Sequence, residues 1–231
     1  MSESASGNAG SNTRHIENGI TIALAEGGFW QYLANPVVEK IWCDFGAETQ
    51  TVFFRDGRTV TVKTGCTVFN DQMGTPVSSD GTKMFVNVWE KGIFCYDLET
   101  MAVVWKLRKL HTMNIILFED YITVDKEGYA VIKIDIETGK IMDEFNCRTL
   151  THHTRVSENE VLAYYIKKTA GIIDTRDMRI VKLFEKSDIP KGIVKYIWKA
   201  AVRYEDEKLK LIPFDENGKT TGANTERSGK E

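Results

Sequence analysis

The feature that most constrains the fold is an aspartate that recurs about every forty residues, at the end of a short apolar segment and before a turn. These aspartates are Asp56, Asp97, Asp135, Asp174 and Asp215, and successive ones are 41, 38, 39 and 41 residues apart. Chance would not easily place five such units this evenly. A repeat of this length is typical of small sheets of about four strands that pack side by side around an axis. The chain is therefore predicted to be an all-β repeat protein.

The segment VIKIDIETGKIMDEF shows why one repeat forms a β-hairpin. Its apolar residues alternate on both sides of a polar turn, which is the pattern of two paired strands. Asp135 and Thr138 can bond to backbone groups of the turn, and Gly139 can adopt the left-handed backbone conformation. The residues upstream supply two more short strands, which makes four strands in about 38 residues.

This hairpin resembles the repeat of quinoprotein-type and WD-type β-propellers. The matching residues are Asp135, Thr138, Gly139 and Lys140, and the preceding repeat keeps Asp97, Thr100 and Trp105 but has Met101 where glycine is usual. The resemblance covers roughly residues 50–218 and implies an all-β, β-propeller-like fold with about five four-stranded blades, closed or open. The Gly-His and Trp-Asp pairs of WD repeats are missing. Five blades are too few to surround a quinone cofactor and its metal, so no cofactor is expected.

The repeats belong to one predicted domain that covers residues 16–218, with clear repeats from about residue 50. Residues 1–15 and 219–231 are polar and are expected to be disordered tails. The segment 16–50 does not follow the repeat and is interrupted by Pro36. Three alternatives remain for this segment: a diverged first blade, a helix over the end of the propeller, or the strand that closes the ring.

Composition argues against several classes of partner. The formal net charge is −3, so neither nucleic acid nor a membrane is expected as the partner. No apolar stretch approaches the roughly 20 residues of a membrane span, and the first residues do not form a secretory signal. The cysteines, Cys43, Cys66, Cys95 and Cys147, form no CxxC pair. We expect free, mostly buried thiols and a cytoplasmic protein.

The two ends of the predicted propeller differ in charge. The connections between blades and the middle hairpin turns share one end, which holds ten Lys or Arg and five acids. The turns that follow the repeat aspartates share the other end and hold eight acids and Arg176. This distribution can steer an acidic partner to the basic end. The alternative is that the acids serve turn geometry and the basic residues serve solubility.

The residues predicted to bind a partner lie at the basic end: Trp89, Lys91, Arg108, His111, Arg148, His152, His153, Arg155, Lys167 and Lys168. Tryptophan is common in interface hot spots, which favours Trp89. Adjacent histidines in an extended segment point to opposite sides, and no nearby carboxylate or cysteine cluster completes a ligand set. We therefore expect loop histidines that contact solvent or a partner. No catalytic or metal-binding residue is predicted.

These features together predict a non-catalytic protein–protein interaction module, either an adaptor or an inhibitor or immunity-type protein. Its partner is expected to be a protein with an acidic surface, and the chain itself a monomer or a small homo-oligomer. Two alternatives stay open: an enzyme with a site in the central channel, and a subunit that completes a larger propeller.

Overall fold

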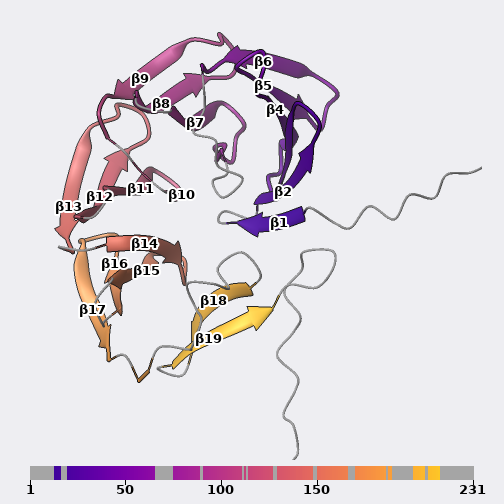
Figure 1. The fold of residues 1–231 in the computed structure, drawn as a ribbon. Helices are drawn as coiled ribbons and strands as arrows, with labels where there is room; N and C mark the ends of the chain where they lie inside the picture. The colour runs from indigo at the N-terminus through magenta and orange to yellow at the C-terminus, as the bar shows by residue number, and fades with distance from the viewer. Residues whose placement is uncertain are drawn as a thin grey trace, which may run out of the picture.

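The computed structural model describes most of the repeat region. The described residues are 13–16, 20–65, 75–88, 91–110, 112, 114–126, 129–147, 150–165, 170–185, 187–188, 200–205 and 208–213. Within them the chain forms nineteen strands in five antiparallel sheets. The sheets follow one another around a common centre in chain order (Figure 1). The predicted all-β, propeller-like fold with about five blades is therefore confirmed.

The first two sheets cover the N-terminal half of the repeat region. The first contains β1 (Thr13–Ile16), β2 (Ile20–Ala25), β3 (Gly28–Leu33), β4 (Val38–Asp44), β5 (Thr49–Phe54) and β6 (Thr59–Lys63). The second contains β7 (Lys83–Val88), β8 (Gly92–Asp97) and β9 (Val103–Leu107). An isolated bridge between Val77 and Met84 stands where the third and fourth sheets have an inner strand.

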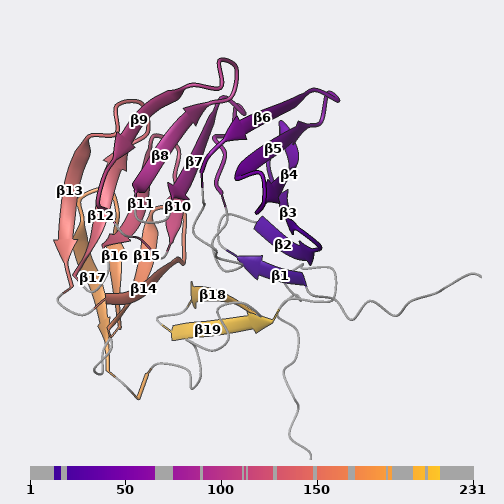
Figure 2. The same ribbon diagram turned by 45° about the horizontal axis from the view of Figure 1, so that its top comes forward.

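The third and fourth sheets match the predicted four-stranded blade. The third contains β10 (Ile115–Leu117), β11 (Tyr121–Lys126), β12 (Ala130–Asp135) and β13 (Ile141–Asn146). The fourth contains β14 (Leu150–Arg155), β15 (Glu160–Tyr165), β16 (Ala170–Asp174) and β17 (Arg179–Phe184). In the described chain the last sheet contains β18 (Ala200–Glu205) and β19 (Lys208–Pro213). Figures 1 and 2 show β6, β9, β13 and β17 on the outside of the ring.

The segment that did not follow the repeat is a diverged first blade with an added hairpin. Strands β3 to β6 form its four-stranded part, and β1 and β2 extend the sheet beyond β3. The alternative of a helix is wrong, because residues 20–50 form strands and turns. Strand β1 spans Thr13–Ile16, at the predicted boundary between the N-terminal tail and the domain. The predicted tail 219–231 lies outside the described residues.

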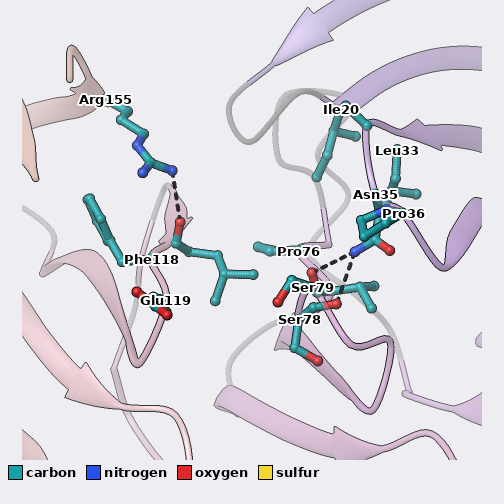
Figure 3. Close-up of a pocket in the computed structure, with 13 residues that line it drawn as sticks. Ile20, Leu33, Asn35, Pro36, Pro76, Ser78, Ser79, Phe118, Glu119 and Arg155 are labelled. Carbon is teal, nitrogen blue, oxygen red and sulfur yellow. Dashed lines mark hydrogen bonds between the residues drawn. The ribbon is translucent and has the colours of Figure 1, made fainter. Parts of the chain in front are cut away.

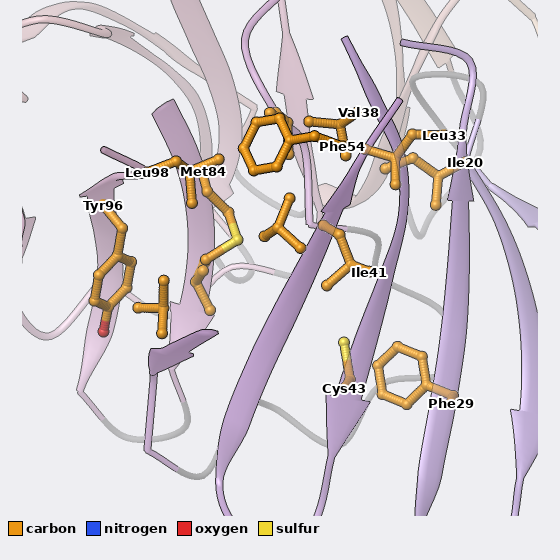
Figure 4. Close-up of a cluster of buried hydrophobic side chains, with 14 of the residues drawn as sticks. Ile20, Phe29, Leu33, Val38, Ile41, Cys43, Phe54, Met84, Tyr96 and Leu98 are labelled. Atoms are coloured by element: carbon orange, nitrogen blue, oxygen red, sulfur yellow. The ribbon is translucent and has the colours of Figure 1, made fainter. Parts of the chain in front are cut away.

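Side chains on the two faces of the second and third sheets enter different hydrophobic clusters. Along β7, Met84 and Val86 belong to the cluster shared with the first sheet, while Phe85 belongs to the cluster shared with the third. Along β10, Ile115 and Ile116 likewise separate into two clusters. Successive side chains of a strand point to opposite faces, so the second and third sheets are buried on both sides. Figure 4 shows the first of these clusters.

The cysteines of the described chain are buried, as predicted. They are Cys43, Cys95 and Cys147, whereas Cys66 lies outside the described residues. Burial raises the pKa of the Cys43 and Cys95 thiols from the ordinary value of 9.0 to about 12, so both stay protonated near neutral pH. The described residues contain no helix that is long and apolar enough to cross a membrane.

Candidate functional site

Two sets of turns meet at one end of the propeller, which we call the pocket face. In a sheet built from consecutive antiparallel strands, the first and third turns must lie at the same end. Backbone hydrogen bonds join the two turns directly: Leu98 N donates to Thr82 O at 2.8 Å, and Ile136 N donates to Asp120 O at 3.3 Å. The turns after Asp97, Asp135 and Asp174 therefore lie at this end, as predicted, while 215–218 lies outside the described residues.

A pocket of about 590 Å³ opens near the centre of the pocket face. Its walls come from Ile20 in β2 and from residues at the turns that precede β4, β7, β11 and β15, in four successive sheets (Figure 3). The lining residues are Ile20, Leu33, Ala34, Asn35, Pro36, Pro76, Val77, Ser78, Ser79, Leu117, Phe118, Glu119 and Arg155. The wall is thus mixed, with aliphatic, aromatic and proline side chains beside hydroxyl, amide and charged groups.

Asn35 holds the wall of the pocket between the first and second sheets. Its Oδ1 accepts hydrogen bonds from Val37 N and Val38 N, both at 2.9 Å. Its Nδ2 donates to Val77 O at 3.2 Å and to Ser78 O at 3.0 Å. The side chain is buried, so these four bonds fix the turn that leads into β4 and link it to the next sheet.

Arg155 plays the corresponding role between the third and fourth sheets. Its Nη1 donates to Leu117 O at 3.2 Å, while Nε and Nη2 donate to Ser157 O at 3.1 Å and Glu158 O at 2.9 Å. The guanidinium also lies 4.6 Å from the centre of the Phe118 ring. Arg155 was predicted to bind a partner at the basic end. That placement is wrong, because β14 carries the chain across the sheet before Arg155 is reached.

Phe118 and Tyr121 extend this contact into a stack with a cation at each end. The two rings stack with centres 4.7 Å apart, and Lys133 Nζ lies 4.1 Å from the centre of the Tyr121 ring. Lys133 Nζ also donates to Arg176 O at 3.0 Å, and Tyr121 Oη lies 2.6 Å from Thr175 Oγ1. Each end of the stack therefore bonds to the fourth sheet, which fixes the position of the Phe118 side of the pocket.

Glu119 is the acidic residue of the pocket wall. It is exposed, and none of the described residues forms a hydrogen bond or an ion pair with its carboxylate. Asp120 is also exposed but does not line the pocket. The sequence contained no signal that distinguished these two neighbouring carboxylates.

His153 is buried between the third and fourth sheets and is 0% exposed. Its Nε2 lies 3.2 Å from Thr123 Oγ1, and its Nδ1 lies 3.8 Å from Asp125 Oδ1. Asp125 Oδ1 also accepts hydrogen bonds from Thr112 Oγ1 and Asn114 N, both at 2.7 Å. The prediction of a loop histidine that contacts solvent is therefore wrong for His153. The residue lies in β14, and strand alternation turns it toward β11.

The other predicted binding residues are only partly described. Lys91 and Arg108 are exposed and lie close together at the opposite end, because β8 and β9 pair up to Ile93 and Leu107. His152 lies in β14, but its side chain is outside the description. Trp89, His111, Arg148, Lys167 and Lys168 lie outside the described residues. In the part that is described, no group of three or more His, Cys, Asp or Glu could hold a metal ion.

Comparisons with known proteins support the fold but do not assign the chain to a family. No protein-family model and no curated protein matches the chain. Among solved structures, BamB from Moraxella catarrhalis is similar, with 12% sequence identity and a TM-score of 0.55 over 90% of this chain and 74% of that one. In all, 952 solved chains match, so the likeness indicates a widely used β-propeller-like architecture and does not by itself fix a function.

Proposed function

We propose that the protein is a non-catalytic interaction module that binds a protein partner at the pocket face. A segment of the partner enters the central pocket. The observation that carries this proposal is the pocket itself, a cavity of about 590 Å³ formed by turns of four successive sheets. Its volume lies within the range of about 300–1,000 Å³ that is common for binding sites.

The chemistry of the wall suits a segment of polypeptide. Pro36, Pro76 and Phe118 offer apolar surface, while Ser79 and Glu119 offer polar groups. A peptide presents both kinds of group along its length. The charged Arg155 already donates to three backbone carbonyls, which is the behaviour of a clamp that holds the turns.

The clamps also support binding through preorganisation. Asn35 and Arg155 tie neighbouring turns together, so little ordering of the wall is needed when a partner arrives. An adaptor and an inhibitor or immunity-type protein both fit a rigid binding face of this kind. The proposed location in the cytoplasm stays a prediction.

Affinity capture from a lysate of the native source, with the whole chain as bait, tests the proposal. Ser79 is exposed and lines the pocket, so Ser79→Trp fills the cavity without disturbing a buried group. Ala47→Trp adds the same bulk in the exposed turn between β4 and β5, at the opposite end. Circular dichroism confirms that both variants are folded.

We expect Ser79→Trp to lose a partner that the wild type and Ala47→Trp both retain. The opposite result would be a partner that Ser79→Trp still captures. If charge reversal at Lys91 and Arg108 then removed that partner, the binding surface would be the basic end, as the sequence predicted, and the pocket proposal would fail.

A further inference from the structure

The carboxylate of Glu119 lines the pocket, and its contacts differ from those of Asp80 and Asp174 in nearby turns. Asp80 accepts hydrogen bonds from Ser78 and Thr82 in its own turn. Asp174 forms an ion pair with Arg176 at 2.6 Å. Glu119 has no such contact with any described residue, although it lines the pocket. Its charge is therefore available to a group that enters from solvent.

The turns around Glu119 carry an excess of negative charge. The segments 117–121 and 155–160 contain four acids, Glu119, Asp120, Glu158 and Glu160, and one basic residue, Arg155. Their net charge is −3. Arg155, the basic residue of these segments, donates to three backbone carbonyls and lies over the Phe118 ring. An incoming cation is therefore attracted to this side of the pocket.

Apolar groups lie beside this carboxylate. Leu117 and Phe118 precede Glu119 in the same turn, and Pro76 contributes to the same pocket. Lysine and arginine have a long aliphatic stem that packs on apolar surface and a charged head that bonds to a carboxylate. An apolar wall with one uncommitted carboxylate matches both parts of such a side chain.

We infer that the pocket takes a lysine or arginine side chain from an extended segment of the partner, with Glu119 as the group that pairs with its charge. The inference rests on the proposed function, because it names the chemistry of the segment that enters the pocket. It also assigns Glu119, which the sequence did not single out, as the residue that determines specificity.

The test uses a library of displayed random heptapeptides selected on the immobilised whole chain. Four proteins are compared: wild type, Glu119→Gln, Asp120→Asn and Ser79→Trp. Asp120→Asn is the matched control, since it removes one negative charge from the adjacent exposed residue that does not line the pocket. A selected peptide and its analogue with glutamine in place of the basic residue are then synthesised, and their dissociation constants are measured.

We expect the wild type and Asp120→Asn to select peptides with a lysine or arginine between apolar residues. Glu119→Gln should bind the basic peptide about tenfold more weakly, because a charge-assisted hydrogen bond is lost. It should bind the glutamine analogue as well as the wild type does. The affinity of the wild type for the basic peptide should also fall as NaCl is raised.

The failures of the two proposals give different results. If the selected peptides have no basic residue, or if Glu119→Gln binds the basic peptide as tightly as the wild type, the inference about Glu119 is wrong. Peptide binding that Ser79→Trp abolishes would still support the pocket in that case. If no peptide is selected, or if Ser79→Trp binds the peptides unchanged, the pocket is not the binding site and both proposals fail.

Discussion

The fourth residue after the repeat aspartate has a left-handed backbone in three successive sheets. Met101, Gly139 and Met178 occupy this position, with φ values of 59°, 69° and 51°. Each of these residues stands near the end of the polar turn that leads into the outer strand, where the chain reverses direction, and a register shift with its extra residue on the outer strand follows a few residues later. At Gly139 the side chain is excluded as well, because a Cβ would lie 2.5 Å from the Trp105 ring.

Replacement of Met101 by glycine is expected to stabilise the protein. Met101 is 55% exposed, so the loss of its side chain costs little packing, and glycine removes a left-handed strain of about 1 kcal/mol. Met178 is buried, so Met178→Gly should lower the free energy of unfolding despite the same backbone benefit. Guanidinium chloride unfolding of both variants measures the difference. Equal effects at the two sites would contradict the explanation.

Loss of the Tyr121 hydroxyl is expected to weaken the contact between the third and fourth sheets. Thr175 Oγ1 donates to Asn159 O at 2.8 Å, so it accepts its second hydrogen bond from Tyr121 Oη. Tyr121→Phe leaves that acceptor buried and unpaired, at a cost of about 1 kcal/mol. Tyr129 is 63% exposed, so Tyr129→Phe is the control and should leave the unfolding midpoint unchanged.

At the scale of the elements, the sequence predicted the hairpins well and the first sheet poorly. The alternation around Asp97, Asp135 and Asp174 corresponds to real strand pairs, because local turn chemistry and strand pattern agree there. The first sheet has an aspartate turn at Asp44 that does not fit the forty-residue spacing, and Pro36 interrupts its pattern. The structure shows that Asn35 accepts hydrogen bonds from the backbone on the far side of this proline and so fixes the turn between β3 and β4, which the sequence pattern did not reveal.

The pocket could not be predicted from the sequence for a related reason. Each sheet contributes a few residues, from Ile20 in the first to Arg155 in the fourth, and these residues share no spacing along the chain. Arg155 was placed at the wrong end because the extent of β14 was not visible. When a strand is longer than the pattern suggests, the residue that ends it lies at the opposite end of the sheet from the predicted one.

Removal of the Asn35 side chain is expected to be among the more damaging single changes at an element boundary. Asn35→Ala removes four hydrogen bonds and leaves the Val37 and Val38 amides and the Val77 carbonyl without this partner, whereas Ser78 O keeps its bond from Gly81 N, a loss of about 2–4 kcal/mol. Asn35→Asp keeps the acceptor for the two backbone amides and loses both donors. Its free energy of unfolding should lie between those of Asn35→Ala and the wild type only if the two hydrogen bonds from the backbone amides dominate. Denaturant unfolding gives the order of the three proteins, and an alanine variant as stable as wild type would refute the clamp.

At the scale of the whole molecule, the repeat aspartates make the free energy of unfolding depend on pH in the acidic range. Asp97, Asp135 and Asp174 accept hydrogen bonds in their turns, and these bonds hold the pKa of each carboxyl below the ordinary value of 3.8. The leading donors are the Thr100 amide, the Thr138 hydroxyl and the Arg176 guanidinium. The unfolded chain therefore takes up protons at a higher pH than the folded chain does.

The free energy of unfolding should be constant above the unfolded pKa and should fall as the pH drops below about 4, since protonation then favours the unfolded chain. Unfolding midpoints measured between pH 6 and pH 2 test this expectation. Asp135→Asn should be less stable than wild type at pH 6, and its stability should fall less steeply in acid. A wild-type midpoint that stays constant down to pH 2 would show that the turn bonds do not favour the ionised carboxylates.

The order of strands in the sheets also has a consequence for how the chain is made. In every sheet of the described chain, neighbouring strands are consecutive in sequence. Each sheet can therefore form from local hairpins as soon as its own residues have left the ribosome, without waiting for distant parts of the polypeptide. The pocket, by contrast, is complete only when the fourth sheet has joined the first three, so a nascent chain is folded in part long before it is able to bind.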